Sequence, residues 1–267
     1  MRAFSETYLS RTRRGMWDDS REALEPLSLE SRTRILDVGC GTGELSGVLA
    51  AECSGQVIGC DADPRLLAVA RERLGGRVVA GDALRLPFSD DAFDLVVCQA
   101  LLINLAEPAN ALSEFARVSS DLVAAIEPDN GAVDVDSSVD AEPSLEARAR
   151  RAYLEGVSTD VTLGADARDA FEEAGLEVLE TRRYDHERTV EPPYGEAALT
   201  AARRKATGAG LADDRATMLS SELTPDGYDE LRSEWREMGR DVIDQMRDRT
   251  YRRTETVPFF VTVGRVP

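Results

Sequence analysis

The sequence predicts an α/β fold in which seven strands form a mostly parallel sheet with helices on both faces. The first observation is a series of short apolar runs separated by helical patterns, because strands that are apolar throughout are typical of buried parallel sheets. The second is a glycine-rich turn directly after the first run. The third is that the last two strands mix apolar and polar residues, as edge or antiparallel strands do. The five apolar runs are Ile35–Val38, Val57–Cys60, Val78–Ala80, Leu95–Cys98 and Leu122–Ile126.

Helix signals lie between these runs. Apolar residues at helical spacing follow Gly43, and Asp63-Pro64 supplies an N-cap and a proline for the first helical position. Pro108 opens a third helix. Because each helix joins two consecutive strands, the connections suit a parallel sheet. The same patterns predict two later helices, Ser144–Gly156 and Ala165–Ala174.

The rest of the chain is expected to hold the last two strands, Leu176–Tyr184 and Val257–Val263, with a helical insertion between them. Residues 195–221 are rich in alanine, and a long helix after Thr224 carries an apolar stripe that we expect to pack against the main domain. The predicted organisation is an N-terminal helical lid, a core, a helical cap, and a final antiparallel strand that belongs to the core. Their bounds are 1–34, 35–190, 191–253 and 254–267.

The charge of the chain limits its partners. Its 267 residues include 50 acidic and 32 basic side chains, for a net charge of −18, and Lys205 is the only lysine. Such acidity repels phosphate backbones and makes nucleic-acid binding unfavourable. Abundant Asp and Glu with so little Lys also indicates a halophilic protein, for which we expect loss of structure in dilute buffer, measurable by circular dichroism.

Composition also bounds location and metal chemistry. Since we see neither a signal peptide nor an apolar stretch of about 18 residues, we expect a soluble, cytoplasmic protein. The four cysteines show no CxxC spacing and are expected to be reduced thiols in the core. His186 is the only histidine, so a metal site built from several histidines is excluded, and we expect this residue to lie plainly on an edge strand or at the surface.

The most informative segment is the turn after the first strand, where Gly39, Gly41 and Gly43 occupy alternate positions before a helix begins. Glycine admits a ligand against bare main chain at the carboxyl edge of a parallel sheet. A nicotinamide fingerprint, G-x-G-x-x-G, would need a glycine where the chain has Glu44. A carboxylate at that helix start also suits a pyrophosphate badly, which ranks an oxidoreductase low.

This turn, with Asp37 before it, resembles motif I of class I S-adenosylmethionine-dependent methyltransferases, and three further motifs of that family follow in register across residues 35–105. The resemblance is to the type 11, UbiE-like core with its Rossmann-like sheet. It implies that Asp61 holds the ribose hydroxyls of S-adenosylmethionine and that Gln99 lies beside the methionine portion. The residues it implies for the cofactor are Asp37, Gly39, Cys40, Gly41, Gly43, Asp61, Ala62, Asp82, Ala83 and Gln99.

Two of these acidic positions also have structural interpretations. Asp37 can act by ordering the glycine loop through backbone N–H groups, and Asp63, next to the second motif, is expected to be a helix cap rather than a ligand. The resemblance assigns Asp82 and the N–H of Ala83 to the adenine. S-adenosylhomocysteine is the product it implies.

Catalysis in this family needs alignment of the acceptor with the methyl group more than acid-base groups, so the sequence identifies no certain base. Weak candidates are Asn104, Glu127 and Asn130, which follow the fourth and fifth strands. No metal is expected. In the N-terminal segment, a lid over cofactor and substrate would present Tyr8, Arg13 and Trp17.

The acceptor is expected to be a small molecule. Arg203, Arg204 and Lys205 in the cap could meet an anionic group of that molecule, or could form a solvated helix face. An RNA-modifying methyltransferase is the second hypothesis, disfavoured because no basic tract accompanies the core. A non-catalytic, S-adenosylmethionine-binding regulatory protein is the third, and a closed pocket beside the methyl group would favour it. The oligomeric state is left open.

Overall fold

The computed structural model describes residues 16–17 and 21–267, and contacts divide the chain into two compact units. The first unit contains the described residues up to Asp129, together with Thr162–Tyr184 and Pro258–Pro267. The second contains Asn130–Val161 and Asp185–Val257. The two long final strands contribute residues to both units.

The sheet has eight strands in the order β3-β2-β1-β4-β5-β8-β6, with β7 paired to β8. Strands β1 to β5 pair in parallel, and β8 runs antiparallel to β5 and β6. The predicted mostly parallel α/β fold is therefore confirmed, with one strand more than expected. The strands are β1 Arg34–Val38, β2 Gln56–Asp61, β3 Val78–Ala80, β4 Phe93–Gln99, β5 Ser119–Pro128, β6 Asp134–Ser137, β7 Glu177–Val190 and β8 Arg253–Arg265.

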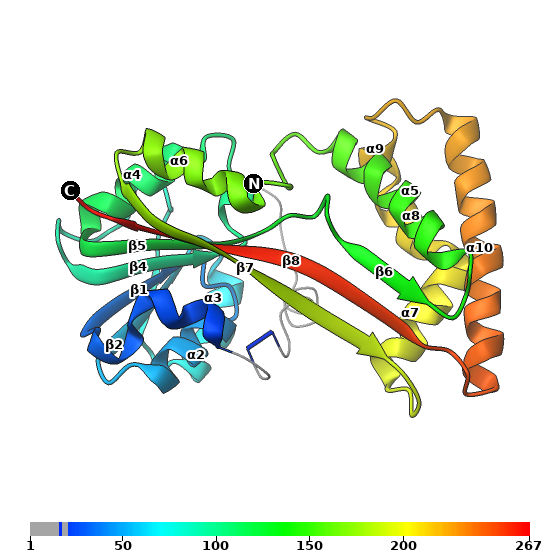
Figure 1. The fold of residues 1–267 in the computed structure, drawn as a ribbon, viewed down its shortest axis with the longest axis horizontal. Helices are drawn as coiled ribbons and strands as arrows, with labels where there is room; N and C mark the ends of the chain where they lie inside the picture. Colours follow the sequence, from blue (N-terminus) through cyan, green and yellow to red (C-terminus); the bar gives the residue numbers. More distant parts are fainter. Residues whose placement is uncertain (1–15, 18–20) are drawn as a thin grey trace. The chain divides into compact units, whose positions relative to one another are not determined.

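Helices cover both faces of the parallel strands in the first unit. Figure 1 shows α2 and α3 on one face and α4 and α6 on the other. Three fully buried phenylalanines, Phe93, Phe115 and Phe171, belong to the core under α4 and α6. The helices are α2 Glu44–Glu52, α3 Pro64–Arg73, α4 Pro108–Val118 and α6 Ala167–Glu173, with short 3₁₀ turns η1 Glu22–Leu27, η2 Leu29–Ser31, η3 Leu102–Asn104 and η4 Gly164–Asp166.

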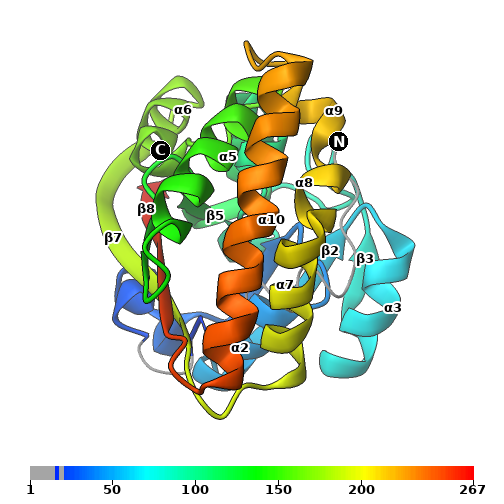
Figure 2. The same cartoon turned by 90° about the vertical axis from the view of Figure 1, so that its right-hand side faces the viewer.

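The second unit is mainly helical, and its long helix α10 lies beside α5 and α7 (Figure 2). A Cβ added at Gly239 of α10 would lie 2.3 Å from the backbone nitrogen of Ala206 in α7, so these two helices pack closely. The apolar stripe of α10 joins Leu145, Ala149 and Ala202 in a core of this unit. Our expectation that the stripe packs against the main domain was thus wrong. The helices are α5 Glu142–Gly156, α7 Glu196–Thr207, α8 Ala209–Asp213, α9 Arg215–Met218 and α10 Pro225–Arg247.

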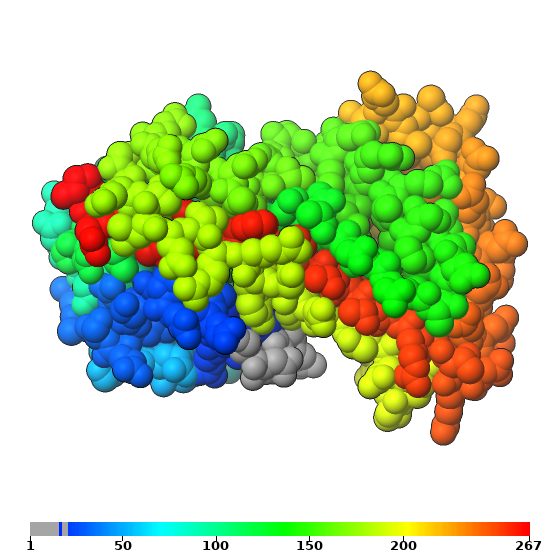
Figure 3. All heavy atoms as spheres, viewed as in Figure 1, coloured from blue at the N-terminus to red at the C-terminus, as the bar shows by residue number. Residues whose placement is uncertain are grey.

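The observed units differ from the expected domain boundaries. Residues 130–161, expected within the core, belong to the second unit because α5 contacts α9 and α10. The expected cap, 191–253, is therefore only part of that unit. Strand β7, which contributes residues to both units, presents charged side chains at alternate exposed positions, and Figure 3 shows this yellow-green segment at the surface. In the described residues, no helix has both the length and the apolar character of a membrane span.

Candidate functional site

The glycine loop follows β1 and all three glycines have positive φ angles, of 70°, 55° and 83° for Gly39, Gly41 and Gly43. Side chains rarely adopt this conformation, which explains the choice of glycine. A Cβ at Gly39 would also lie 3.0 Å from Leu101 Cδ1. The loop therefore needs glycine both for its path and for its packing.

The N–H groups of this loop are largely used inside the protein. Gly39 and Cys40 donate to the carbonyl of Cys60, at 2.7 and 3.1 Å, and Gly43 donates to the carbonyl of Cys40 at 2.8 Å. These N–H groups are therefore not available to a ligand. The loop instead lets a ligand approach the backbone closely, because no side chains stand in the way. Cys40 packs its side chain beneath the loop with Leu67.

Asp61, at the end of β2, is the group that ties the loop to the next strand. Its Oδ2 accepts from the N–H of Gly41 and its Oδ1 from that of Asp63, both at 2.8 Å. Each carboxylate oxygen can accept a second hydrogen bond, and the residue is half-buried, so acceptor capacity remains for two hydroxyl groups. The geometry fits a diol.

Asp37 and Asp63 have local partners. Asp37 is 1% exposed and accepts from the Ser46 hydroxyl of α2, which links β1 to the helix after the loop. Asp63 caps α3 by accepting from the N–H of Arg65 at 2.9 Å. Hydrogen bonds from the Arg65 side chain and backbone lower the pKa of Asp63 to about 2. The expected capping role of Asp63 is confirmed.

The turn after β3 carries Asp82 and Ala83. Asp82 Oδ1 accepts from the N–H of Leu84 at 3.0 Å, and a second bond closes the turn from the Arg85 N–H to the Asp82 carbonyl at 2.9 Å. Ala83 is buried between two exposed neighbours. This turn lies at the same carboxyl edge as the glycine loop, because β3, β2 and β1 are parallel neighbours.

Four residues meet beyond the end of β4. The Gln99 amide Nε2 lies 2.7 Å from the Met16 thioether, and the Tyr184 hydroxyl donates to the Met16 carbonyl. Trp17 stacks on Tyr184 with ring centroids 5.2 Å apart. Sequence reasoning identified Gln99 and Trp17 but missed Met16 and Tyr184, since only the fold brings β7 to this place. Tyr8 and Arg13 lie outside the described residues.

Glu127 is buried completely near the end of β5 and holds the loop after β4. It accepts from the N–H groups of Leu101 at 3.0 Å, Leu102 at 2.9 Å and Ile103 at 3.3 Å, and so caps η3. These contacts favour a structural role over proton removal. The neighbouring Asn104 donates to the Ala100 carbonyl at 2.9 Å, while its Oδ1 is buried with no partner among the described residues.

Asn130, the third weak candidate, belongs to the second unit. Its Nδ2 donates to the Val161 carbonyl at 2.6 Å, so the amide joins the two ends of the segment Asn130–Val161. His186 lies on β7, which pairs with β8 at the margin of the described sheet, so the expected edge-strand position is confirmed. Its side chain is nevertheless buried, at 4% exposure, and does not lie at the surface. Within the described residues no group of three potential ligands could hold a metal ion.

Of the three cations singled out in the cap, Arg203 is exposed, whereas Arg204 and Lys205 have acidic partners inside the second unit. Lys205, with its side chain 16% exposed, pairs with Glu142 and Glu146, and Arg204 pairs with Asp213. Burial alone would raise the pKa of Glu146, but the charges of Lys205 and Arg253 outweigh it and lower that pKa. The description of this segment as a solvated face is therefore wrong for Lys205, and its ammonium is engaged by protein carboxylates.

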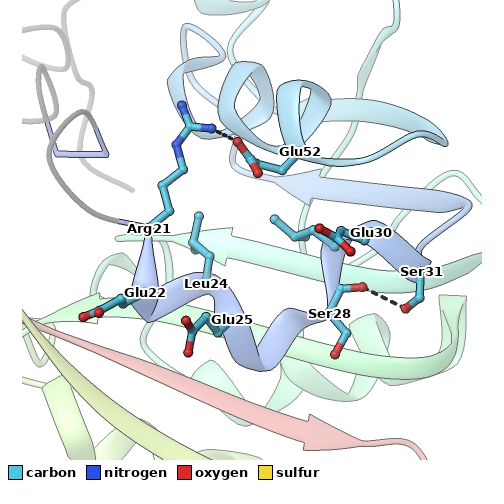
Figure 4. Close-up of a pocket in the computed structure, with 9 residues that line it drawn as sticks. Arg21, Glu22, Leu24, Glu25, Ser28, Glu30, Ser31 and Glu52 are labelled. Carbon is cyan, nitrogen blue, oxygen red and sulfur yellow. Dashed lines mark hydrogen bonds and ion pairs between the residues drawn. The ribbon is translucent and has the colours of Figure 1, made fainter.

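A cavity of about 610 Å³ lies elsewhere, at the opposite edge of the sheet, where η2 leads into the start of β1 (Figure 4). Arg21 points across it toward Glu52 at the end of α2, and the two form an ion pair. The walls are mainly acidic and polar residues of η1 and η2. Because the glycine loop follows the other end of β1, this cavity is separate from the site described above.

Comparison with known proteins agrees with this geometry. A family described as a methyltransferase domain matches residues 36–121. The demethylmenaquinone methyltransferase of Lactiplantibacillus plantarum is 36% identical over 107 residues, which cover 37% of this chain and 45% of that protein. The O-methyltransferase cnsE of Penicillium expansum is 29% identical over 168 residues, covering 60% and 58%. The chain thus spans about half the length of the curated relatives it matches.

Solved structures share the fold over most of the chain. A Bacillus halodurans protein described as a candidate methyltransferase has a TM-score of 0.53 at 19% identity, with 92% of this chain and 99% of that chain covered. YcgJ of Bacillus subtilis has a TM-score of 0.51 at 15% identity, covering 91% and 97%. At these identities the likeness concerns the fold.

Proposed function

We propose that this chain, which matches a methyltransferase domain over residues 36–121, is a class I S-adenosylmethionine-dependent methyltransferase and transfers a methyl group to a small-molecule acceptor. S-adenosylmethionine is the cofactor of this domain. The names of two relatives, a demethylmenaquinone methyltransferase and an O-methyltransferase, support a small-molecule acceptor. The proposal includes a cytoplasmic location, which agrees with four buried free cysteines, and adaptation of the acidic surface to high salt.

The observation that carries the proposal is the pairing of the glycine loop with Asp61. The loop presents backbone without side chains, and Asp61 is fixed by two N–H groups with acceptor capacity left for the ribose hydroxyls. Asp82 and Ala83 would hold the adenine from the next strand. These residues fit the cofactor, and the buried unpaired Oδ1 of Asn104 supplies a further polar contact for a ligand.

The bound cofactor supplies a methyl group activated by its sulfonium. The chain has to align a nucleophile with that carbon, and alignment alone can contribute roughly 7–11 kcal/mol to lowering the barrier. Glu127 holds the backbone of the loop after β4 in place, and Asn104 on that loop is the group we assign to orienting the acceptor. Burial, followed by the charge of Asp61, raises the pKa of Cys60 to about 12, so this thiol stays protonated and takes no part as a nucleophile.

Calorimetric titration with S-adenosylhomocysteine tests the binding claim. Asp61→Ala should weaken binding by about 1.5–3 kcal/mol, the scale of hydrogen bonds to a charged group. Asp63→Ala is the matched control, because it removes a nearby carboxylate that caps α3 and should leave the affinity unchanged. Equal affinities of the wild-type protein and Asp61→Ala would contradict the ribose role.

The acceptor class needs a second experiment. Methyl-labelled cofactor is incubated with the protein and a cell extract, which is then separated into RNA, protein and small-molecule fractions. Label in the small-molecule fraction supports the proposal, and label in RNA would establish the alternative of RNA modification. Binding of the cofactor with no transfer into any fraction would favour a regulatory protein.

A further inference from the structure

We propose that Trp17 is a cofactor-binding residue that donates its indole N–H to the carboxylate of the cofactor's methionine portion, and that Tyr184 is the residue that positions it. This inference rests on the proposed function. Trp17 is 4% exposed, and its Nε1 has no hydrogen-bond partner within the described part of the chain. A buried donor of this kind is costly unless a ligand completes it.

Contacts of the preceding residue place Trp17 beside the expected methionine end of the site. Met16 is fully buried, and its thioether meets the amide of Gln99, the residue expected beside the methionine portion. Because Met16 and Trp17 are consecutive, the backbone of Trp17 lies close to the end of β4. Arg21 Nε also donates to the Trp17 carbonyl at 3.3 Å, which holds the backbone on the other side.

The chemistry of the cofactor then determines which of its groups can accept a hydrogen bond from the indole N–H. An indole N–H can only donate, and it needs an acceptor. In the methionine portion the ammonium is a donor and the sulfonium is a cation, so only the carboxylate can accept. A charged acceptor also makes the stronger hydrogen bond.

Tyr184 fixes this donor in two ways. Its ring stacks on the indole at 5.2 Å with 22° between the planes, and its hydroxyl donates to the Met16 carbonyl. Tyr184 thereby covers one face of the Trp17 ring. The only polar atom of the side chain, Nε1, lies on the ring edge and is the atom that can bind a polar group of a ligand. Tyr184 comes from β7, about 170 residues away in the sequence, and makes the site depend on that strand.

The test compares two ligands by calorimetry, S-adenosylhomocysteine and 5′-methylthioadenosine, which lacks the amino-acid portion. Trp17→Phe keeps the stacking and should weaken S-adenosylhomocysteine binding about 10- to 100-fold while leaving methylthioadenosine binding unchanged within about twofold. Tyr184→Phe keeps the ring and should weaken only S-adenosylhomocysteine, about threefold. Methylthioadenosine binding also reports that each variant is folded at the site.

Tyr194→Phe is the matched control, since the Tyr194 hydroxyl donates to the Tyr251 carbonyl at 3.0 Å in the second unit. It should change neither affinity. Equal losses for both ligands, or no loss in Trp17→Phe, would overturn the inference. If the wild-type protein bound neither ligand, the proposed function itself would fail, and the two failures are thus distinguishable.

Discussion

In the first unit, the buried carboxylates of Asp37 and Glu127 accept hydrogen bonds from a hydroxyl and from backbone N–H groups. In the second unit, those of Glu142 and Glu146 face Lys205, with Arg253 beside them. The first arrangement shapes loops at the carboxyl edge of the sheet. The second joins α5, α7 and β8.

The buried carboxylates therefore have different structural roles in the two units. A carboxylate that gathers several N–H groups fixes the path of a loop, which suits a site where the backbone approaches a ligand. An ion-pair network between helices selects one arrangement of elements that apolar packing alone would define less sharply, and we offer this as a hypothesis for the second unit. Each unit also contains one of the two tryptophans, Trp17 in the first and Trp235 in the second, and tryptophan fluorescence can therefore report on each unit.

Removing Lys205 is the change expected to have the largest effect, because it tests how much the ion-pair network stabilises the second unit. Lys205→Met leaves Glu142 and Glu146 with less compensating charge, and loss of one partner of a buried pair costs about 3–5 kcal/mol. We expect this loss in urea unfolding followed by Trp235 fluorescence, since Lys205 Nζ lies 6.0 Å from that ring centroid. Arg148→Ala, which removes an exposed pair with Glu234, is the control and should cost less than about 1 kcal/mol.

A Lys205→Met variant within about 1 kcal/mol of the wild-type protein would show that the network contributes as little as a surface pair. The charges would then be a consequence of the packing of α5 and α7, and the contrast between the two units would disappear.

The corresponding change in the first unit is Glu127→Gln. The amide keeps one acceptor oxygen but turns an NH₂ toward backbone N–H groups, which should cost about 2 kcal/mol of stability. Because these N–H groups belong to the loop after β4, affinity for S-adenosylhomocysteine should fall as well. Unfolding followed by Trp17 fluorescence and calorimetry measure the two effects, with the exposed Glu107→Gln as control. Lost stability with unchanged affinity would separate Glu127 from the site.

Sequence reasoning predicted the first unit well because its elements are local and periodic. The apolar runs matched β1 to β5 within a few residues, and the alternate glycines predicted the turn after β1, in which the structure finds three positive φ angles. The short strand β6 was missed, since its residues, Asp134–Ser137, carry hardly any apolar signal. Its pairing with β8, more than 100 residues later, supplies the stability that local sequence does not show.

The second unit was predicted as helices but not as a core of its own. Periodicity shows which face of α10 is apolar, but it cannot show which elements cover that face. In the same way, the isolated lysine at position 205 was visible, while its two carboxylate partners on α5 are about 60 residues away. Met16 and Tyr184 were missed at the candidate site for the same reason, because the tertiary fold alone brings them together.

Lowering the pH is expected to give the smallest change in folding stability among these predictions. Burial raises the pKa of Glu255, but Arg188 and Arg253 outweigh it and lower the pKa to about 2 from an ordinary value of 4.5. A carboxyl whose pKa is lower in the folded state stabilises the fold above about pH 4.5, and that stability is lost as pH falls toward 2. Between pH 6 and pH 4 we expect a loss of about 1 kcal/mol from this group in unfolding followed by Trp235 fluorescence. Glu255→Gln should lose correspondingly less over that interval than the wild-type protein, and identical pH profiles would show that the arginines do not hold this carboxylate.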